Sequence, residues 1–359
     1  MPVTPSLRPA TLRDVAAAAG VHLSTVSLAL SGSPKIRPDT RARLTAIAER
    51  LHYRRDPVYF ALSARRELAR HPPPPPLITF ITNRVDQAAF DEGVHMPAFL
   101  AGAQAQAHAM GFACELLLVG DQALSPAAIE QRLQARGTQG VILAAFMPDL
   151  RRLELDWSRY TVVKIDSSFM PPDVARISHD QHQILAVACQ RLHALGYRRI
   201  GMAVGEFDEE GSQQHYSTAY RLQQHLLGLP ALPPFHFRWR ESEPTPSRRL
   251  VQWAKAHRLD GVISNFLNIR DLLETGGLPV PSKIACASLC LNAPDPKNAG
   301  LVMDHKTVGR KAVEMIALLI KTRQFGVPAS APSLFVEGRW CDGASAPAVL
   351  RNTEKSRKR

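Results

Sequence analysis

The chain has 359 residues, of which 45% are hydrophobic and 21% charged, and it carries a formal net charge of +12 at pH 7. This composition is typical of a globular protein with room for one small domain and a larger one of two lobes. It contains neither a signal-peptide pattern nor about 18 consecutive apolar residues, so we expect a cytoplasmic protein with no membrane contact. The five cysteines lack metal-ligand spacing, and we expect reduced thiols, no metal and no cofactor.

The positive charge is confined to the two ends of the chain. Residues 1–71 hold 12 lysines and arginines against 5 acidic residues, and residues 351–359 hold 5 against 1. The long segment between them is therefore nearly neutral. A basic end on a neutral body is the pattern of a phosphate-binding module joined to a sensor, so nucleic acid is the expected partner.

The first predicted domain, residues 1–55, is small and all-helical. Apolar residues recur at helical spacing in three segments, about 12–19, 21–30 and 44–51. Thr11 and Asp14 predict a capping box, Gly20 suits the left-handed turn after the first helix, and Pro38 suits the first position of the third. The first two helices, joined by a glycine turn, predict a helix-turn-helix.

The second of these helices carries a small polar face that suits contact with DNA, because early residues of a recognition helix reach base edges and hydroxyls reach phosphates. The alternative is a purely structural helical hairpin, which the basic charge of this region makes less favourable. Arginines nearby are candidates for phosphate contact or are simply solvated helix charges. The expected DNA-binding residues are His22, Leu23, Ser24, Thr25, Ser27, Leu28, Arg37, Arg41, Tyr53, Arg54 and Arg55.

Residues 56–76 predict a hinge helix followed by a linker. Asp56-Pro57 is a helix start, and the helix is expected to run over about 57–66. The prolines at 72–76 lack amide donors and favour an extended polyproline spacer.

Residues 77–347 predict an α/β domain, because strand-length apolar runs alternate with helical stretches. This succession predicts parallel sheets, split between two lobes with a ligand cleft between them. The expected strands are 77–82, 141–145, 161–165, 200–204, 261–264 and 284–289, and the expected helices are 97–110, 126–136, 181–195, 216–227 and 246–257. The basic tail, 348–359, is predicted to be disordered, and it lacks the leucine heptads of a tetramerisation helix.

The head resembles the LacI (lactose and purine repressor) family through "TLRDVAAAAGV", "TVSLAL", "SGSPKIRPDTRARLTAIAERLHY" and "RRDPVYFAL". The likeness continues through "LHALGYRRIGMAV", "LDGVISNF" and "HKTVGRKAVEMIALLI", so it covers nearly the whole chain. It implies a homodimeric transcription regulator, more often a repressor than an activator, which binds a near-palindromic double-stranded operator. It also implies a periplasmic-binding-protein-like sensor for a small-molecule effector, expected to be sugar-like.

The resemblance also implies a role for Leu62, which aligns with a leucine that inserts between base pairs in the central minor groove. Packing of a short amphipathic helix is the alternative. Two positions depart from the family pattern in the head. His22 stands in place of a capping serine, and Leu28 stands in place of a base-reading arginine, so we expect less demand for G·C at the corresponding operator position.

Effector contacts are expected in the loops that follow the strands. The candidates are Arg84, Asp86, Phe146, Ser168, Ser212, Tyr216 and Asn265. The resemblance implies that Asn265 hydrogen-bonds the effector, and a loop-capping role is the alternative. Tyr216, Phe266 and Leu289 or Cys290 replace charged residues of the family's sugar clamp. The effector could therefore be a less polar molecule, a larger oligosaccharide, or absent.

Two other classes of protein share parts of this pattern. A solute-binding protein would have the two-lobed fold but no basic helical head. An α/β enzyme acting on a sugar or nucleotide would need a catalytic set, and none of the common motifs occurs. The pairs His179-Asp180 and Asp304-His305 resemble acid/base pairs, but both fall at helix starts, where capping is the expected role.

Overall fold

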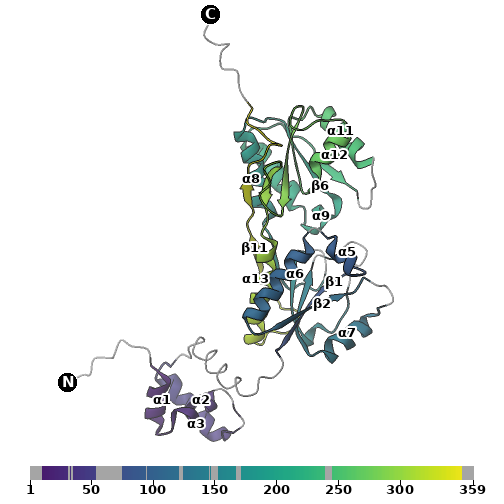
Figure 1. Ribbon diagram of the computed structural model, residues 1–359. Helices are drawn as coiled ribbons and strands as arrows, with labels where there is room; N and C mark the ends of the chain where they lie inside the picture. Colours follow the sequence, from purple (N-terminus) through teal and green to yellow (C-terminus); the bar gives the residue numbers. More distant parts are fainter. Residues whose placement is uncertain are drawn as a thin grey trace, which may run out of the picture. The chain divides into compact units, whose positions relative to one another are not determined.

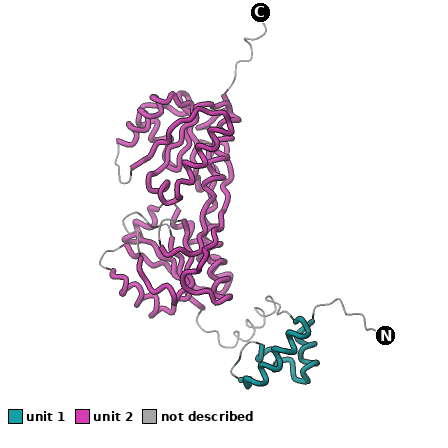
Figure 2. The backbone as a smooth tube through the Cα atoms, turned by 180° about the vertical axis from the view of Figure 1, so that it is seen from behind, with its two compact units in different colours: residues 1–74 teal, residues 75–359 magenta. Residues whose placement is uncertain are grey.

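The computed structural model describes residues 10–30, 33, 35–53, 75–93, 95–120, 124–144, 146, 153–166, 171–238 and 245–349. The chain divides into two compact units, residues 1–74 and 75–359, and the boundary between them falls within the proline run of the sequence (Figures 1 and 2). Within the described ranges, no helix has the length and apolar character that crossing a membrane requires. The predicted hinge helix and residues 350–359 of the tail lie outside the described residues.

The first unit is a bundle of α1 (Leu12–Ala19), α2 (Leu23–Leu30) and α3 (Pro38–Arg50). Its core is built on Val15, Val26 and Leu44, which are fully buried. The predicted capping box is present, since the Thr11 hydroxyl accepts from the amide of Asp14 and the Asp14 carboxylate accepts from the amide of Thr11. Gly20 has φ +64° and Pro38 opens α3, as predicted.

The second unit consists of two lobes, each built on a six-stranded sheet, which confirms the predicted α/β fold (Figure 1). The sheet of lobe 1 has the order β11-β5-β4-β3-β1-β2, and that of lobe 2 has the order β12-β10-β9-β8-β6-β7. Adjacent strands are parallel except for β10 and β12. The carboxyl ends of parallel strands therefore gather at one edge of each sheet, where a ligand site is expected.

Lobe 1 contains the following elements: β1 (Leu77–Thr82), α5 (Gln87–Asp91), α6 (Met96–Ala109), β2 (Ala113–Leu118), α7 (Pro126–Ala135), β3 (Thr138–Ala144), β4 (Thr161–Ile165), β5 (Ala175–His179), α13 (His305–Lys321) and β11 (Ser333–Val336). Lobe 2 contains these: α8 (Gln181–Ala194), β6 (Ile200–Gly205), α9 (Glu206–Gly211), α10 (His215–Leu226), β7 (Phe235–Phe237), α11 (Thr245–Ala256), β8 (Gly261–Ser264), α12 (Ile269–Thr275), β9 (Ala285–Leu291), β10 (Ala299–Val302) and β12 (Arg339–Cys341).

The chain passes between the lobes three times: between β5 and α8, between β10 and α13, and between β11 and β12. Asp180 caps α8 and Asp304 caps α13, each by accepting a backbone N–H with its carboxylate, so the predicted capping role is confirmed. The side-chain amide of Gln183 exchanges two hydrogen bonds of 3.3 Å with the backbone of Gly338. This amide ties the first crossing to the third.

Helices α6 and α13 lie side by side over the sheet of lobe 1 (Figure 1). Their close approach depends on two glycines. A Cβ atom at Gly102 would collide with the carbonyl group of Lys306, and one at Gly309 would collide with the carbonyl oxygen of Phe99. Because α13 begins at the second crossing, this tight contact fixes the position of one hinge segment against lobe 1.

Candidate functional site: the head surface and the interlobe cleft

The head presents part of α2 to solvent. Ser24 and Ser27 are exposed, Thr25 and Leu28 are half-buried, and the half-buried Leu23 packs against the head core. His22 stands directly before the helix, with its Nδ1 2.8 Å from the hydroxyl of Ser24 and positioned to accept from the Ser24 amide at 3.4 Å. The imidazole therefore supplies the acceptor that a capping serine would supply.

The other predicted DNA contacts fall into three groups. Arg37 is exposed at the start of α3, and Tyr53 is half-buried against the head core. Arg41 donates to the carbonyl oxygens of Ser33 (2.7 Å) and Ile36 (3.3 Å), so it braces the loop before α3. Arg54, Arg55 and Leu62 lie outside the described residues. Contact of each of these positions with DNA stays a prediction.

A cavity of about 390 Å³ lies between the two lobes. Five of the predicted effector residues line it: Arg84, Phe146, Ser212, Tyr216 and Asn265. Asp86 does not, because its carboxylate accepts from the amide of Ala89 and caps α5. Ser168 lies outside the described residues. The remaining wall includes Asp166, Arg176, His179, Asp208 and His305, none of which was among the predicted effector residues.

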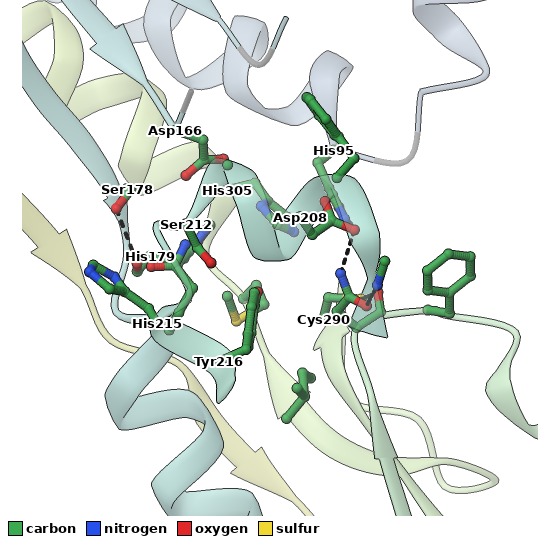
Figure 3. Close-up of a pocket in the computed structure, with 18 of the residues that line it drawn as sticks. His95, Asp166, Ser178, His179, Asp208, Ser212, His215, Tyr216, Cys290 and His305 are labelled. Carbon is green, nitrogen blue, oxygen red and sulfur yellow. Dashed lines mark hydrogen bonds between the residues drawn. The ribbon is translucent and has the colours of Figure 1, made fainter. Parts of the chain in front are cut away.

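Asn265 follows β8 and connects two parts of lobe 2. Its side-chain oxygen accepts from the amide of Gly205 at 3.1 Å, and its nitrogen donates to Asp208 Oδ2 at 2.7 Å (Figure 3). The side chain thereby holds the end of β6 and orients an acidic group at the cleft. Effector contact by Asn265 stays a prediction.

Two carboxylates from opposite lobes approach each other in the cleft. Asp166 follows β4 with φ +54°, and its Oδ1 is buried without a partner among the described residues. Burial raises the pKa of Asp166 to about 7, with repulsion from Asp208 adding to the rise and Arg176 opposing it. Burial also raises the pKa of Asp208, against the hydrogen bond from Asn265. Loss of water thus disfavours the charged form of both acids.

Three histidines, His95, His179 and His305, form what we call the histidine wall (Figure 3). The rings of His95 and His305 stack with centroids 4.1 Å apart, and His179 meets His305 edge to face at 4.8 Å. His179 and His305 are 4% and 5% exposed. Burial, followed by the other histidines, lowers the pKa of His305 to about 2, and burial first also lowers that of His179 to about 4. The histidine wall is therefore uncharged at neutral pH.

The histidine wall stands where the lobes meet. His179 ends β5 at the first crossing, and His305 begins α13 after the second. His95 precedes α6 in lobe 1, and its Nδ1 lies 3.3 Å from Oδ1 of Asn292, which follows β9 in lobe 2. A change in the angle between the lobes would therefore alter this polar contact.

Comparison with known proteins gives matches in both units. The model of a family described as bacterial regulatory proteins, lacI family, matches residues 11–56. The HTH-type transcriptional regulator MalR of Streptomyces coelicolor is 28% identical over 229 residues, which cover 61% of each chain. The HTH-type transcriptional regulator reg1 of Streptomyces lividans is 28% identical over 200 residues, covering 54% of this chain and 53% of the relative. The matches span about three fifths of these relatives' length or less.

Solved structures share the fold along most of the chain. A transcriptional regulator CelR–cellobiose complex has a TM-score of 0.59 at 19% identity, covering 94% of this chain and 99% of that one. A lac repressor dimer bound to operator and the anti-inducer ONPF has a TM-score of 0.58 at 15% identity, covering 95% and 100%. At such identities the likeness shows the architecture, a helical head followed by two α/β lobes.

Proposed function

We propose that the chain is a sequence-specific transcription regulator of the lacI family, with repression as the expected sense, because the model of that family of bacterial regulatory proteins matches its head at residues 11–56. A small-molecule effector, bound in the cleft between the lobes, controls it. The main support for the proposal is the helical head. It contains the residues that match the family model, and it exposes polar side chains on α2. A purely structural hairpin would have no need of that face or of the surrounding positive charge.

The proposed active form is a homodimer on double-stranded operator DNA. The support is the lac repressor dimer on its operator, a structure that shares this fold. A two-fold protein reads two half-sites related by the same symmetry, so the operator is a near-palindrome. Leu62 is the proposed wedge residue at its centre.

Control by the effector follows from the three crossings between the lobes. A ligand that touches both walls of the cleft stabilises one angle between them, and by doing so shifts the population of lobe orientations. In the dimer, that angle sets the distance between the two segments that lead to the heads. The effector class supported by the relatives is a sugar, since a protein of this fold binds cellobiose.

The test is selection of bound sequences from random duplex DNA by the purified full-length protein, followed by binding of the selected sequence over a salt series. We expect a palindrome with a flexible central step, and an affinity that falls steeply with salt because phosphate contacts release counterions.

A pair of matched variants makes this test specific to α2. Ser27→Asp places a negative charge on the exposed face of α2 and should lower the affinity for the selected operator about ten-fold or more, by repulsion from phosphates. Ser282→Asp makes the same change at an exposed position of lobe 2 and should leave the affinity unaltered. Recovery of no enriched sequence, or equal binding by the two variants, would contradict the proposed function.

A further inference from the structure

We propose that the histidine wall, with Arg84 and Arg176, receives an acid group of the effector, either a carboxylate or a phosphate. This inference rests on the proposed function, and it names a chemical requirement of the ligand in the same cleft. A neutral sugar does not meet that requirement.

Three ring nitrogens of the histidine wall are buried without a hydrogen-bond partner among the described residues. Neither nitrogen of His305 has a partner among the described residues, and neither has Nε2 of His179. Both side chains line the cavity and are more than nine-tenths buried. Their neighbours include Phe99, whose ring meets that of His305 edge to face at 5.1 Å. A phenyl ring would serve packing here equally well, so unsatisfied nitrogens at a cavity wall point to a ligand that supplies their partners.

Two arginines of the cavity wall also have unpartnered nitrogens. Nε of Arg84 and Nε of Arg176, on the same cavity, are also buried without a partner among the described residues. A guanidinium nitrogen can only donate, whereas a neutral imidazole has one N–H and one nitrogen that accepts. Neutral His179 donates its N–H to the backbone of Asp304, so its unpartnered Nε2 is an acceptor. The unpartnered donors are therefore one nitrogen each of Arg84, Arg176 and His305. A proton taken up by either ring turns its accepting nitrogen into a further donor, and an acid group offers several acceptor oxygens at one place.

The guanidinium charges of Arg84 and Arg176 also favour an anionic ligand. In the described part of the chain, Arg84 forms no ion pair with a carboxylate; it feels Glu92 only at longer range, and burial lowers its pKa. Arg176 lies near Asp166, where its charge partly opposes the rise that burial causes in the pKa of that carboxyl group. A bound anion would stabilise both guanidinium groups.

The histidines add a coupling to protons. The groups that face the histidine wall are Asn292 from the end of β9 and Asp304 from the start of α13, together with the three rings themselves. Without a ligand, burial and mutual repulsion keep the rings neutral. A nearby anion favours the charged form of an imidazole, so binding of the acid group takes up a proton.

The experiment is calorimetric titration of the full-length protein with glucuronate, glucose 6-phosphate and glucose, at about pH 6 and about pH 8 in buffers of different ionisation enthalpy. We expect at least one of the two acids to bind ten-fold or more tightly than glucose, with proton uptake and with an affinity that rises by up to about ten-fold per unit fall in pH. Preference for glucuronate identifies a carboxylate, and preference for glucose 6-phosphate identifies a phosphate.

Variants assign the effect to the histidine wall. His305→Phe keeps a ring beside His95 and Phe99 but removes both nitrogens, and His305→Gln keeps one donor and one acceptor; thermal unfolding reports whether each folds. Both should lose the proton uptake, and His305→Phe should also lose the preference for acids. His108→Phe, at an exposed position of α6, is the matched control and should behave like the parent protein.

Three results would overturn the inference: glucose binding as tightly as both acids, binding of neither acid, or an unchanged acid preference in His305→Phe. The selection of operator DNA is a separate measurement. A protein that selects a palindrome but prefers glucose would refute this inference and leave the proposed function in place.

Discussion

Leu28 lies half-buried on α2, in a position from which the resemblance expects an arginine to read guanine. A leucine can meet only apolar surface, such as a thymine methyl group, whereas an arginine donates to guanine O6 and N7. Leu28→Arg should therefore gain preference for G·C at one position of each half-site, worth about 1–3 kcal/mol. Selection of bound sequences by both proteins measures it, and identical selected sequences would show that this residue does not read a base.

Asp166 gives a second prediction for a single side chain. Its pKa of about 7 lies above the ordinary carboxyl value, so between about pH 4 and pH 7 the folded state holds a proton that the unfolded state has lost. The free energy of unfolding therefore falls as pH rises through that window. Asp166→Asn should remove this loss and be more stable than the parent above pH 7, by at most about 4 kcal/mol at about 1.4 kcal/mol per pKa unit.

The measurement for Asp166 is urea unfolding of both proteins across this pH range. Asp271→Asn, an exposed position of α12, is the matched change from carboxylate to amide. A stability difference between parent and Asp166→Asn that stays constant from pH 4 to pH 8 would contradict the assigned pKa shift.

The sequence indicated part of the cleft at this scale. Tyr216, Asn265 and Arg84 follow strands or loops whose positions the apolar pattern predicts, so their approach to one cavity could be expected. His95 could not be found in this way, because it precedes a helix rather than following a strand. The residues that it contacts, such as His305, are far from it in the sequence. His179 and His305 each stand beside an aspartate, and the sequence pattern predicted only that Asp180 and Asp304 cap helices. That capping role is confirmed, but it gave no reason to place the two histidine rings in the cleft.

Helices α6 and α13 give a prediction for a pair of elements. Gly309→Ala should push α13 away from α6, because the new Cβ collides with the backbone of Phe99. Overpacking of this kind typically destabilises by about 1–3 kcal/mol, which exceeds the roughly 1 kcal/mol that alanine contributes over glycine in a helix. Gln104→Ala on the exposed face of α6 is the control. Chemical denaturation compares them, and an equal or more stable Gly309→Ala protein would show that the helices separate freely.

The predicted strands are those whose burial is nearly continuous. All six appear, as β1, β3, β4, β6, β8 and β9, in the middle of the two sheets. The other six were not predicted, for physical reasons. The edge strand β2 is only half-buried and contains Glu115, β5 carries Arg176 and His179 toward the cleft, and β7, β10, β11 and β12 have three or four residues each. Such strands owe their conformation to neighbours rather than to local preference.

For the whole molecule, linkage gives a prediction that needs no knowledge of the path between cleft and head. If the effector changes operator affinity by some factor, the operator must change effector affinity by the same factor. Titration of the effector into the free protein and into its complex with the selected operator should therefore give affinities that differ about 5- to 150-fold, the usual range of such coupling. A non-specific duplex of equal length is the control, and equal affinities in all three cases would exclude allosteric control.

The three crossings also determine the order in which the protein can be completed during its own synthesis. Five of the six strands of lobe 2, β6 to β10, come from one continuous stretch of the chain. Lobe 1, in contrast, is complete only when α13 and β11, near the end of the chain, have been synthesised. We expect the ribosome to release a nearly finished lobe 2 while the first-made lobe still exposes the face of α6 that α13 will cover. Protease digestion of nascent chains arrested after β10 would show this as protection of lobe 2 alone. We therefore expect lobe 1, although it is synthesised first, to fold last. Until then, the surface of α6 that α13 later covers is the expected binding site for chaperones.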